Sequence, residues 1–207
     1  MPIPFLTATW TGAVGALLIG YLLGSIPFGL LFSYAFGEGD VRKIGSGTIG
    51  ATNVLRTGNY AAAALTLLFD AAKGAAPVWI AAHFWGSDAA LFAALGAFLG
   101  HLFPVWLSFK GGKGIAVSLG ILLVLCWPVA LASLATWIAM LALFRISSLA
   151  ALVTAVFAPL YMHLFGPEHA AVLAFVLAVL ALFAHIENIR RLLRGDEPRI
   201  GAKTKPA

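Results

Sequence analysis

Charged side chains are scarce in this sequence. Of its 207 residues, 61% are hydrophobic and only 10% are Asp, Glu, Lys or Arg, whereas an average soluble domain has about 25% charged residues. So few charges cannot cover a soluble domain of this size, and a disordered chain would have low hydrophobicity instead. The composition therefore predicts an all-α, polytopic integral membrane protein, with residues 1–207 forming a single membrane-embedded domain.

Cysteines and metal-ligand motifs are also scarce. Cys126 is the only cysteine, so no intrachain disulfide can form and a disulfide scaffold is excluded. There is no HExxH motif and no cluster of histidines with carboxylates, so no metal is indicated. Gly45, Gly47 and Gly50 match G-x-G-x-x-G, but the βαβ context of a dinucleotide site is missing. We therefore expect neither a metal nor an organic cofactor.

Long apolar segments make up most of the chain. They are separated by short polar stretches and run over residues 5–36, 60–85, 89–109, 115–144, 147–165 and 170–184. A membrane-spanning helix needs about 20 residues, so the fourth segment is too long for one span. It holds Trp127-Pro128 near its middle, and a proline inside a helix removes a hydrogen bond and clashes with the preceding turn. A break there gives seven transmembrane helices, two of them short.

The basic residues favour seven spans over six. With the N-terminus outside, seven spans place the Lys and Arg residues of segments 42–56, 110–113, 145 and 190–205 on the cytoplasmic face. Six spans would leave Arg145 and the C-terminal tail outside, against the positive-inside rule. We therefore expect a cytoplasmic C-terminus, with residues 195–207 as a polar, basic tail. The net charge of +5 then indicates topology and anionic substrates rather than nucleic acid.

The first polar segment, GSGTIGATNVLR at 45–56, combines glycines with hydrogen-bond donors. Glycines let backbone N–H groups approach an anion, and the N-terminus of a following helix points its positive end at it. An arginine fork suits phosphate. The candidate phosphate-binding residues here are Gly45, Ser46, Gly47, Thr48, Asn53 and Arg56. The alternative is a flexible interfacial loop.

The second polar segment, FKGGKG at 109–114, leads directly into an apolar helix. It is not a Walker A loop, but a glycine-rich turn with two ammonium groups at a helix N-terminus suits a phosphate. The candidates are Lys110, Gly111, Gly112, Lys113 and Gly114. The alternative is topological positive charge with turn glycines.

The third polar segment is HIENIRRLLRGDE at 185–197. If the last span continues as a helix, His185, Asn188 and Arg191 lie along one side of it, because residues three apart are neighbours on a helix. Arg190 and Arg194 then point elsewhere, toward water or anionic lipid. The alternative is a basic helix at the membrane surface.

Ionisable residues also occur inside apolar spans. Asp70 and Lys73 are three residues apart in the second segment, and His101 lies in the third. Such groups are costly in a membrane and often functional, yet the Asp70–Lys73 pair could simply neutralise itself. Together with Glu197 they are candidates for a supporting role.

The motifs together resemble one family, the bacterial acyl-phosphate:glycerol-3-phosphate acyltransferases, or PlsY family. The matching stretches are YLLGSIPF (21–28), GSGTIGATNVLR (45–56), FDAAKG (69–74), GHLFPVWLSFKGGKG (100–114) and HIENIRRLLRGDE (185–197). Chain length, motif order and the expected topology agree with the family. One position departs, since many members carry Asn where Thr48 stands.

The resemblance implies transfer of a fatty acyl group from acyl phosphate to the 1-hydroxyl of glycerol 3-phosphate. The products would be 1-acyl-glycerol 3-phosphate (lysophosphatidic acid) and phosphate, in the first step of bacterial phospholipid synthesis. It also implies a multi-pass protein of the cytoplasmic (inner) membrane, surrounded by lipid, with its active site on the cytoplasmic face. A functional link to the enzyme that makes acyl phosphate follows.

The resemblance also assigns roles. His185 and Asn188 would orient the glycerol hydroxyl or the reacting carbonyl, and Ser46 and neighbouring backbone N–H groups would cradle the acyl phosphate. Arg56 and Lys113 would hold phosphate. The main alternative function is a small transporter or channel for an anionic solute, which intramembrane Asp70–Lys73 and broken helices would suit. The absence of inverted repeats and the clustering of polar segments at one face argue against it.

Overall fold

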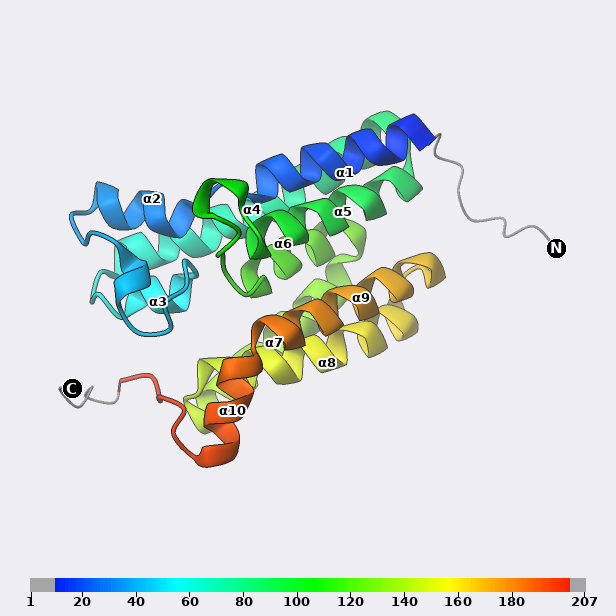
Figure 1. The fold of residues 1–207 in the computed structure, drawn as a ribbon. Coiled ribbons are helices and arrows are strands. Elements are labelled where there is room, and N and C mark those ends of the chain that lie inside the picture. The colour runs from blue at the N-terminus through cyan, green and yellow to red at the C-terminus, as the bar shows by residue number, and fades with distance from the viewer. Residues whose placement is uncertain (1–9, 202–207) are drawn as a thin grey trace.

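The computed structural model describes residues 10–201 and is all-helical over them (Figure 1). Two 3-10 helices, η1 (Val41–Lys43) and η2 (Val105–Leu107), lie in the loops. The α-helices are α1 (Trp10–Gly24), α2 (Phe28–Ala35), α3 (Ala51–Leu55), α4 (Tyr60–Trp85), α5 (Ser87–Leu102), α6 (Ile115–Leu125), α7 (Trp127–Phe144), α8 (Ser147–Phe165), α9 (Glu168–Ala184) and α10 (Ile186–Arg194).

The prediction of a polytopic helical membrane protein is confirmed. Among the described residues, five helical stretches are long and apolar enough to cross a membrane: Trp10–Ala35, Tyr60–Trp85, Ser87–Leu107, Trp127–Phe144 and Ser147–Phe165. The bent pair of α9 and α10 makes a sixth if it counts as one span, and α6 is a shorter apolar helix. The predicted break at Trp127-Pro128 is confirmed, because α6 ends at Leu125 and α7 begins at Trp127 with its proline in the first turn.

Three predicted segments have different shapes. The first is interrupted between α1 and α2, before Phe28, where Pro27 cannot continue a helix; its residues 5–9 lie outside the described range. The third ends as an α-helix at Leu102 rather than Phe109. The last span does not run straight on, since α9 and α10 are bent by 60° around His185.

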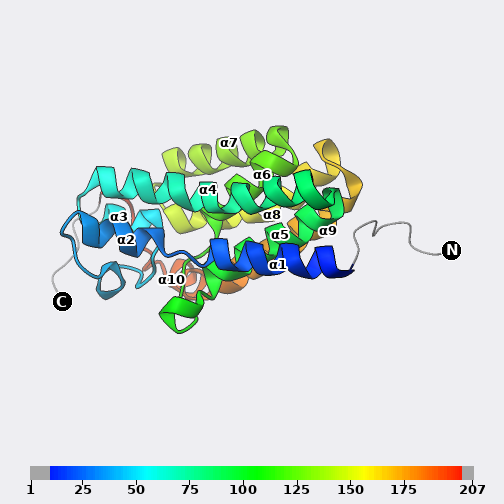
Figure 2. The same ribbon diagram turned by 90° about the horizontal axis from the view of Figure 1, so that it is seen from above.

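The helices form two layers, seen edge-on in Figure 1 and from above in Figure 2. One layer contains α1, α2, α4, α5 and α6, and the other contains α7, α8, α9 and α10. Helix α5 packs against α1 and α4, and α8 packs between α7 and α9. The layers meet where α6 contacts α7 and where α5 contacts α9. The polar segments, α3 and α10 gather at one end (Figure 1).

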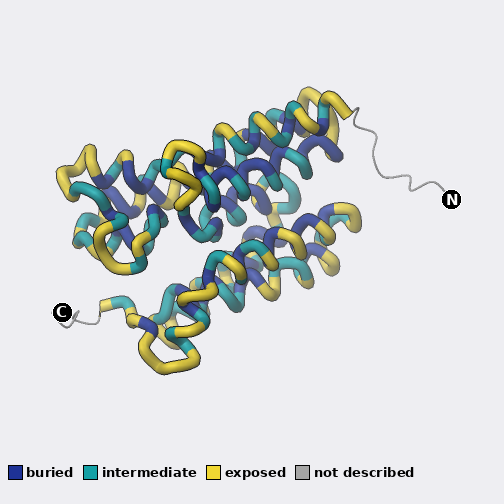
Figure 3. Tube along the Cα trace, viewed as in Figure 1, coloured by how far each residue is buried: buried dark blue, intermediate teal, exposed yellow. Residues whose placement is uncertain are grey.

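Small residues let the helices of the first layer approach closely. A Cβ atom at Gly20 or Gly24 of α1 would collide with the backbone of Ala93 or Ala97 of α5. Close backbone approach through small residues is a common way for helices to associate in a membrane, where apolar burial between helices gains little. The outer faces carry exposed residues (Figure 3), among them large apolar ones such as Phe84 and Val172. Such faces suit lipid rather than water.

Candidate active site

A cavity of about 510 Å³ lies between the two layers. Residues of α3, α4 and α6 line it on one side, and residues of α7, α8 and α9 line it on the other. Its polar end, here called the mouth, lies where the three polar segments meet. The mouth residues are Ser46, Thr48, Arg56, Lys113, Asn188 and Glu197.

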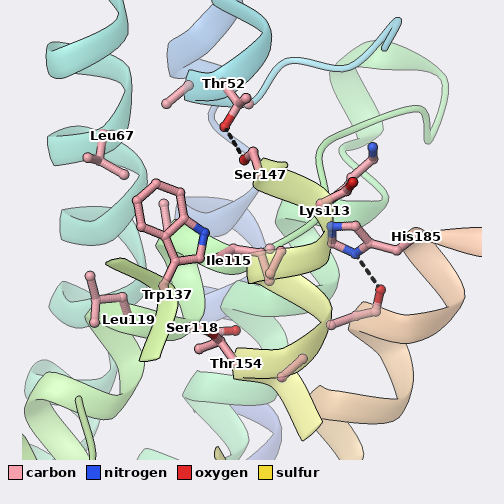
Figure 4. Close-up of a pocket in the computed structure, with 18 of the residues that line it drawn as sticks. Thr52, Leu67, Lys113, Ile115, Ser118, Leu119, Trp137, Ser147, Thr154 and His185 are labelled. Carbon is pink, nitrogen blue, oxygen red and sulfur yellow. Dashed lines mark hydrogen bonds between the residues drawn. The ribbon is translucent and has the colours of Figure 1, made fainter. Parts of the chain in front are cut away.

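Away from the mouth the lining is mostly apolar, with a few hydroxyl groups such as those of Ser118 and Thr154. Leu67 of α4, Leu119 of α6 and Trp137 of α7 surround its middle, as the close-up in Figure 4 shows. On α8 the lining runs from Ser147 to Ala158, which at 1.5 Å per residue is about 16 Å. Thr52 of α3 and Ser147 of α8 join the two layers above this apolar part, with 3.1 Å between their hydroxyl oxygens (Figure 4). The cavity therefore suits a molecule with an anionic head and a long apolar tail.

Asn53 organises the first polar segment. Its buried amide donates to the carbonyl oxygens of Val41 (2.8 Å), Ile44 (3.2 Å) and Thr48 (2.8 Å), and its oxygen accepts from the backbone N–H of Ser46 (2.9 Å). The donors of Asn53 are thus engaged within the loop, so the structure gives it a role in shaping the site. Its predicted direct contact with substrate stays a prediction.

The expected backbone cradle is not available at two positions. The N–H of Ser46 donates to Asn53, and that of Gly47 donates to the Ile44 carbonyl oxygen (3.0 Å). What this part of the loop offers instead is a pair of hydroxyls, since Ser46 Oγ and Thr48 Oγ1 lie 2.9 Å apart in the cavity lining. Thr48, which stands where many family members carry Asn, thus places a second hydroxyl beside that of Ser46.

Gly45 allows Arg56 to reach the mouth. Gly45 has a left-handed φ of +54°, and a Cβ there would collide with the Arg56 guanidinium and with Asn53. The Arg56 guanidinium lies 3.4 Å from Asn53 Oδ1. Within the described residues it forms no ion pair, so its charge is available to an anion.

The second polar segment is folded onto the end of α5. The N–H of Gly112 donates to the carbonyl oxygen of His101 (3.0 Å), and a Cβ at Gly112 would collide with the His101 imidazole. Gly114 then caps α6 in a left-handed conformation. These contacts turn Lys113 into the cavity, whereas Lys110 is exposed and lies outside the cavity lining. The two predicted lysines are therefore not equivalent.

The stretch before this turn is fixed to the break between α1 and α2. Trp106 Nε1 donates to Ser25 Oγ (2.8 Å), and the Tyr21 hydroxyl donates to the Phe103 carbonyl oxygen (2.8 Å). The sequence matches at 21–28 and 100–114 thus belong to one structural unit that presents Lys113.

Glu197 is the centre of the third segment. Its carboxylate accepts from Ser148 Oγ (2.7 Å), Asn188 Nδ2 (2.6 Å) and Arg191 Nε (2.7 Å). Asn188 in turn accepts from the Lys113 ammonium. Arg191 forms an ion pair with Glu197 and is not part of the cavity lining. Its predicted contact with phosphate stays a prediction.

Charges at the mouth act on one another. Burial lowers the pKa of Lys113 to about 8, with Glu197 opposing the shift and Arg191 and Arg56 adding to it. Burial also lowers the pKa of Arg56, which Glu197 partly offsets; a guanidinium remains charged nonetheless. Burial would raise the pKa of Glu197, but hydrogen bonds from Ser148, Asn188 and Arg191 outweigh it, so the pKa lies below its ordinary value.

His185 lies at the bend between α9 and α10 and is buried in the cavity wall. Its Nδ1 lies 2.7 Å from the Ala181 carbonyl oxygen, which can only accept, so Nδ1 carries a proton. A neutral imidazole then has its lone pair on Nε2. In Figure 4 this second nitrogen lies on the side of Lys113. The expectation that His185, Asn188 and Arg191 lie along one side assumed a straight helix, which the 60° bend between α9 and α10 replaces. His185 and Asn188 both line the cavity, whereas Arg191 does not.

Asp70, Lys73 and His101 form a separate buried group. Lys73 Nζ lies 2.7 Å from Asp70 Oδ1 and donates to the Ile26 carbonyl oxygen (2.7 Å), and Asp70 Oδ1 lies 3.9 Å from His101 Nδ1. Asp70 and His101 line the cavity, but Lys73 does not. Lys73 instead donates to a carbonyl oxygen at the break between α1 and α2, which also accepts from the N–H of Phe28 (3.1 Å).

Sequence reasoning missed several polar residues of the lining. Ser147, Ser148 and Arg199 are among them. The sequence could have indicated Ser147 and Ser148, since two adjacent hydroxyl residues stand at the start of an apolar span, next to the polar face. Within the described residues, no group of three or more His, Cys, Asp or Glu could hold a metal ion.

Comparison with known proteins gives consistent matches. The sequence model of the glycerol-3-phosphate acyltransferase family matches residues 14–195 of this chain. A glycerol-3-phosphate acyltransferase of Mesorhizobium japonicum is 59% identical over 192 residues, which are 93% of this chain and 98% of that protein. One of Cereibacter sphaeroides is 58% identical over 186 residues, 90% of this chain and 89% of that protein.

Solved structures agree with these sequence matches. The chain is similar to a crystal structure of PlsY, an integral membrane glycerol 3-phosphate acyltransferase, in its glycerol 3-phosphate form (TM-score 0.86, 38% identity, 91% of this chain and 96% of that chain). It is equally similar to the lysophosphatidic acid form of PlsY (TM-score 0.85, 37% identity, 91% of this chain and 95% of that chain).

Proposed function

This chain belongs to the glycerol-3-phosphate acyltransferase family, and we propose that it transfers a fatty acyl group from acyl phosphate to the 1-hydroxyl of glycerol 3-phosphate. The products would be lysophosphatidic acid and inorganic phosphate, in the first step of bacterial phospholipid synthesis. The enzyme that makes acyl phosphate would then supply its donor.

One observation carries this proposal: a single cavity joins a cation-bearing mouth to an apolar groove. Arg56 and Lys113 stand at the mouth, and the lining of α8 continues for about 16 Å into apolar surroundings. An acyl phosphate has a phosphate head and an apolar tail, and it would fill both parts at once. Glycerol 3-phosphate has no tail and would occupy the mouth only. A transporter would instead place its polar site near the membrane midplane.

The reaction needs no covalent intermediate on the protein. The glycerol oxygen attacks the acyl carbonyl carbon, the carbonyl–phosphate C–O bond breaks, and phosphate leaves with the bonding electrons. The hydroxyl proton goes either to Nε2 of His185 or to a phosphate oxygen. Because the mixed anhydride has a good leaving group, positioning and charge stabilisation supply most of the acceleration.

The position of each side chain indicates its role in binding the phosphates or in orienting the glycerol hydroxyl. Arg56 and Lys113 would neutralise the phosphates, and the Ser46 and Thr48 hydroxyls would donate to the acyl phosphate. Asn188 is held by Glu197 and Lys113, so it would orient the glycerol hydroxyl next to His185. Ser46 as a covalent nucleophile is not supported, because its hydroxyl lies beside the Thr48 hydroxyl (2.9 Å) rather than beside a base.

We further infer seven membrane passes, counting α1 with α2 as the first, followed by α4, α5, α6, α7, α8 and α9. Support comes from the charges, because the turns at 86–88, 126–128 and 166–169 contain no Lys or Arg. In this topology the N-terminus is outside, the C-terminus and the mouth are cytoplasmic, and the protein resides in the bacterial inner membrane.

The test is a reconstituted reaction. Purified protein in liposomes receives acyl phosphate with and without glycerol 3-phosphate, and lysophosphatidic acid and phosphate are measured; acyl-CoA in place of acyl phosphate tests the donor. We expect product only when both substrates are present, and none with acyl-CoA. Uptake of glycerol 3-phosphate into the liposomes without product would support a transporter, and a Ser46-linked acyl group would contradict direct transfer.

A further inference from the structure

After α10 the chain turns back toward the cavity. Gly195 ends α10 in a left-handed conformation, and the N–H of Asp196 donates to the Arg191 carbonyl oxygen (2.9 Å). Residues 196–201, here called the C-terminal strap, then cross from α10 toward the turn between α7 and α8. The sequence model of the family ends at residue 195, and the family-like stretch ends at Glu197, so Pro198 and Arg199 lie beyond both. The expected basic tail at 195–207 is thus part of the cavity wall up to residue 201, and its remaining residues lie outside the described range.

The strap is tied down on both sides of one dipeptide. At one side Glu197 accepts hydrogen bonds from Ser148, Asn188 and Arg191. At the other, the N–H of Ile200 donates to the Arg145 carbonyl oxygen (2.7 Å), and the Arg145 guanidinium donates to the Ile200 carbonyl oxygen (3.1 Å). Only Pro198 and Arg199 lie between these ties, and proline fixes its own φ. The backbone of Arg199 is therefore held at the cavity.

Arg199 is a cation of the cavity lining that has no carboxylate partner. It lines the cavity together with its neighbours Pro198 and Ile200, and within the described residues it forms no ion pair. The nearby Arg191 is committed to Glu197, and Arg194 lies outside the lining, 3.6 Å from Asp196. Arg199 therefore resembles Arg56 and Lys113 rather than the other arginines of this segment.

The positive charges of Arg56 and Lys113 alone do not balance the negative charge of the two substrate phosphates, so a further unpaired cation at the mouth would be useful. The proposed reaction brings two phosphate groups together, and each carries about −1.5 to −2 charges near neutral pH. Arg56 and Lys113 supply two positive charges, while Arg191 and Glu197 cancel. We propose that Arg199 binds a substrate phosphate as a third cation of the site, positioned by the tie between Ile200 and Arg145. This inference rests on the proposed function.

The test compares Arg199→Gln with Arg199→Lys in the acyl transfer assay, with KM determined separately for acyl phosphate and glycerol 3-phosphate. A charge-assisted hydrogen bond to phosphate is worth enough for about a tenfold to hundredfold effect. We expect Arg199→Gln to raise KM for one substrate by that factor and to weaken inhibition by inorganic phosphate, and Arg199→Lys to restore much of both. The substrate whose KM rises identifies the phosphate that Arg199 contacts.

Arg194→Gln is the matched control, because it removes an arginine of the same segment that lies outside the cavity; its KM values should equal those of the wild type. Arg145→Met loosens the tie to Ile200, so it should raise the same KM as Arg199→Gln, and adding it to Arg199→Gln should have little further effect. Unchanged KM and phosphate inhibition in Arg199→Gln, while the wild type is active, would overturn the inference. An inactive wild type would instead contradict the proposed function.

Discussion

At the scale of single residues, the two lysines of the glycine-rich turn show how the fold separates similar side chains. Lys113 contacts Asn188 and lines the cavity, whereas Lys110 is exposed outside it. We expect Lys113→Ala to lower kcat/KM about a hundredfold or more, as loss of a charge-stabilising donor does, and Lys110→Ala to have a far smaller effect. Steady-state kinetics with acyl phosphate and glycerol 3-phosphate measures both. Equal losses in the two variants would contradict the assignment.

The lowered pKa of Lys113 predicts a pH dependence. Burial holds that pKa at about 8, so the ammonium is present below this pH and is lost as the pH rises through it. Phosphate substrates have their second pKa near 6 and do not change charge there. We expect kcat/KM to fall above about pH 8. In Lys113→Arg the guanidinium does not titrate, so this alkaline decline should disappear even if the variant is slower; a decline that persists belongs to another group.

At the scale of helices, a buried ion pair in α4 contacts the break in the first span. Lys73 pairs with Asp70 and donates to the Ile26 carbonyl oxygen, and its ammonium lies 5.7 Å from the centre of the Phe28 ring. Removing one member of a buried pair leaves an uncompensated charge and costs about 3–5 kcal/mol. Lys73→Met should therefore lower the melting temperature in detergent strongly, and adding Asp70→Asn should recover part of the loss. A single variant as stable as the wild type would show that the pair is dispensable.

The contact between α1 and α5 depends on glycine at particular turns of the helix. A Cβ at Gly24 would overlap the backbone of Ala97, whereas one at Gly15, in the same helix, would meet nothing within 4 Å. We expect Gly24→Val to lower the melting temperature markedly, because α1 and α5 must separate, and Gly15→Val to leave it nearly unchanged. Thermal unfolding of the two purified variants side by side gives the comparison. Similar melting temperatures would mean that the close approach contributes little.

At the scale of the whole molecule, the single cysteine reports topology. Cys126 lies between α6 and α7 and is partly exposed, in a turn that seven passes place outside. A membrane-impermeant thiol reagent should label it in intact cells, after the outer membrane is permeabilised, without access to the cytoplasm. In Cys126→Ser with Leu193→Cys, the thiol stands on the exposed face of α10 and should react only after lysis. The reverse pattern would invert the proposed orientation.

Much of this protein is determined by its sequence alone. Few charges and long apolar segments predict membrane-spanning helices, because such apolar helix surfaces are stable in lipid but not in water. Trp127-Pro128 marks the break between α6 and α7. Grouping of the polar segments at one end was also predictable, since Lys and Arg alternate with uncharged turns along the chain. Four residues of the mouth, Ser46, Thr48, Arg56 and Lys113, were expected from the sequence because their donor groups suit phosphate.

The tertiary structure decided which of those residues reach the cavity. Spacing along the chain cannot show that the Asn53 amide donates within its own loop, that Arg191 pairs with Glu197, or that Lys110 lies outside the cavity lining. Nor can it show that Ser148 of α8 and Asn188 of α10 both donate to the Glu197 carboxylate of the strap, because these residues come from separate elements. Hydrogen bonds and charges act through space at a few ångströms, so only the packing of the two layers determined which cations line the cavity.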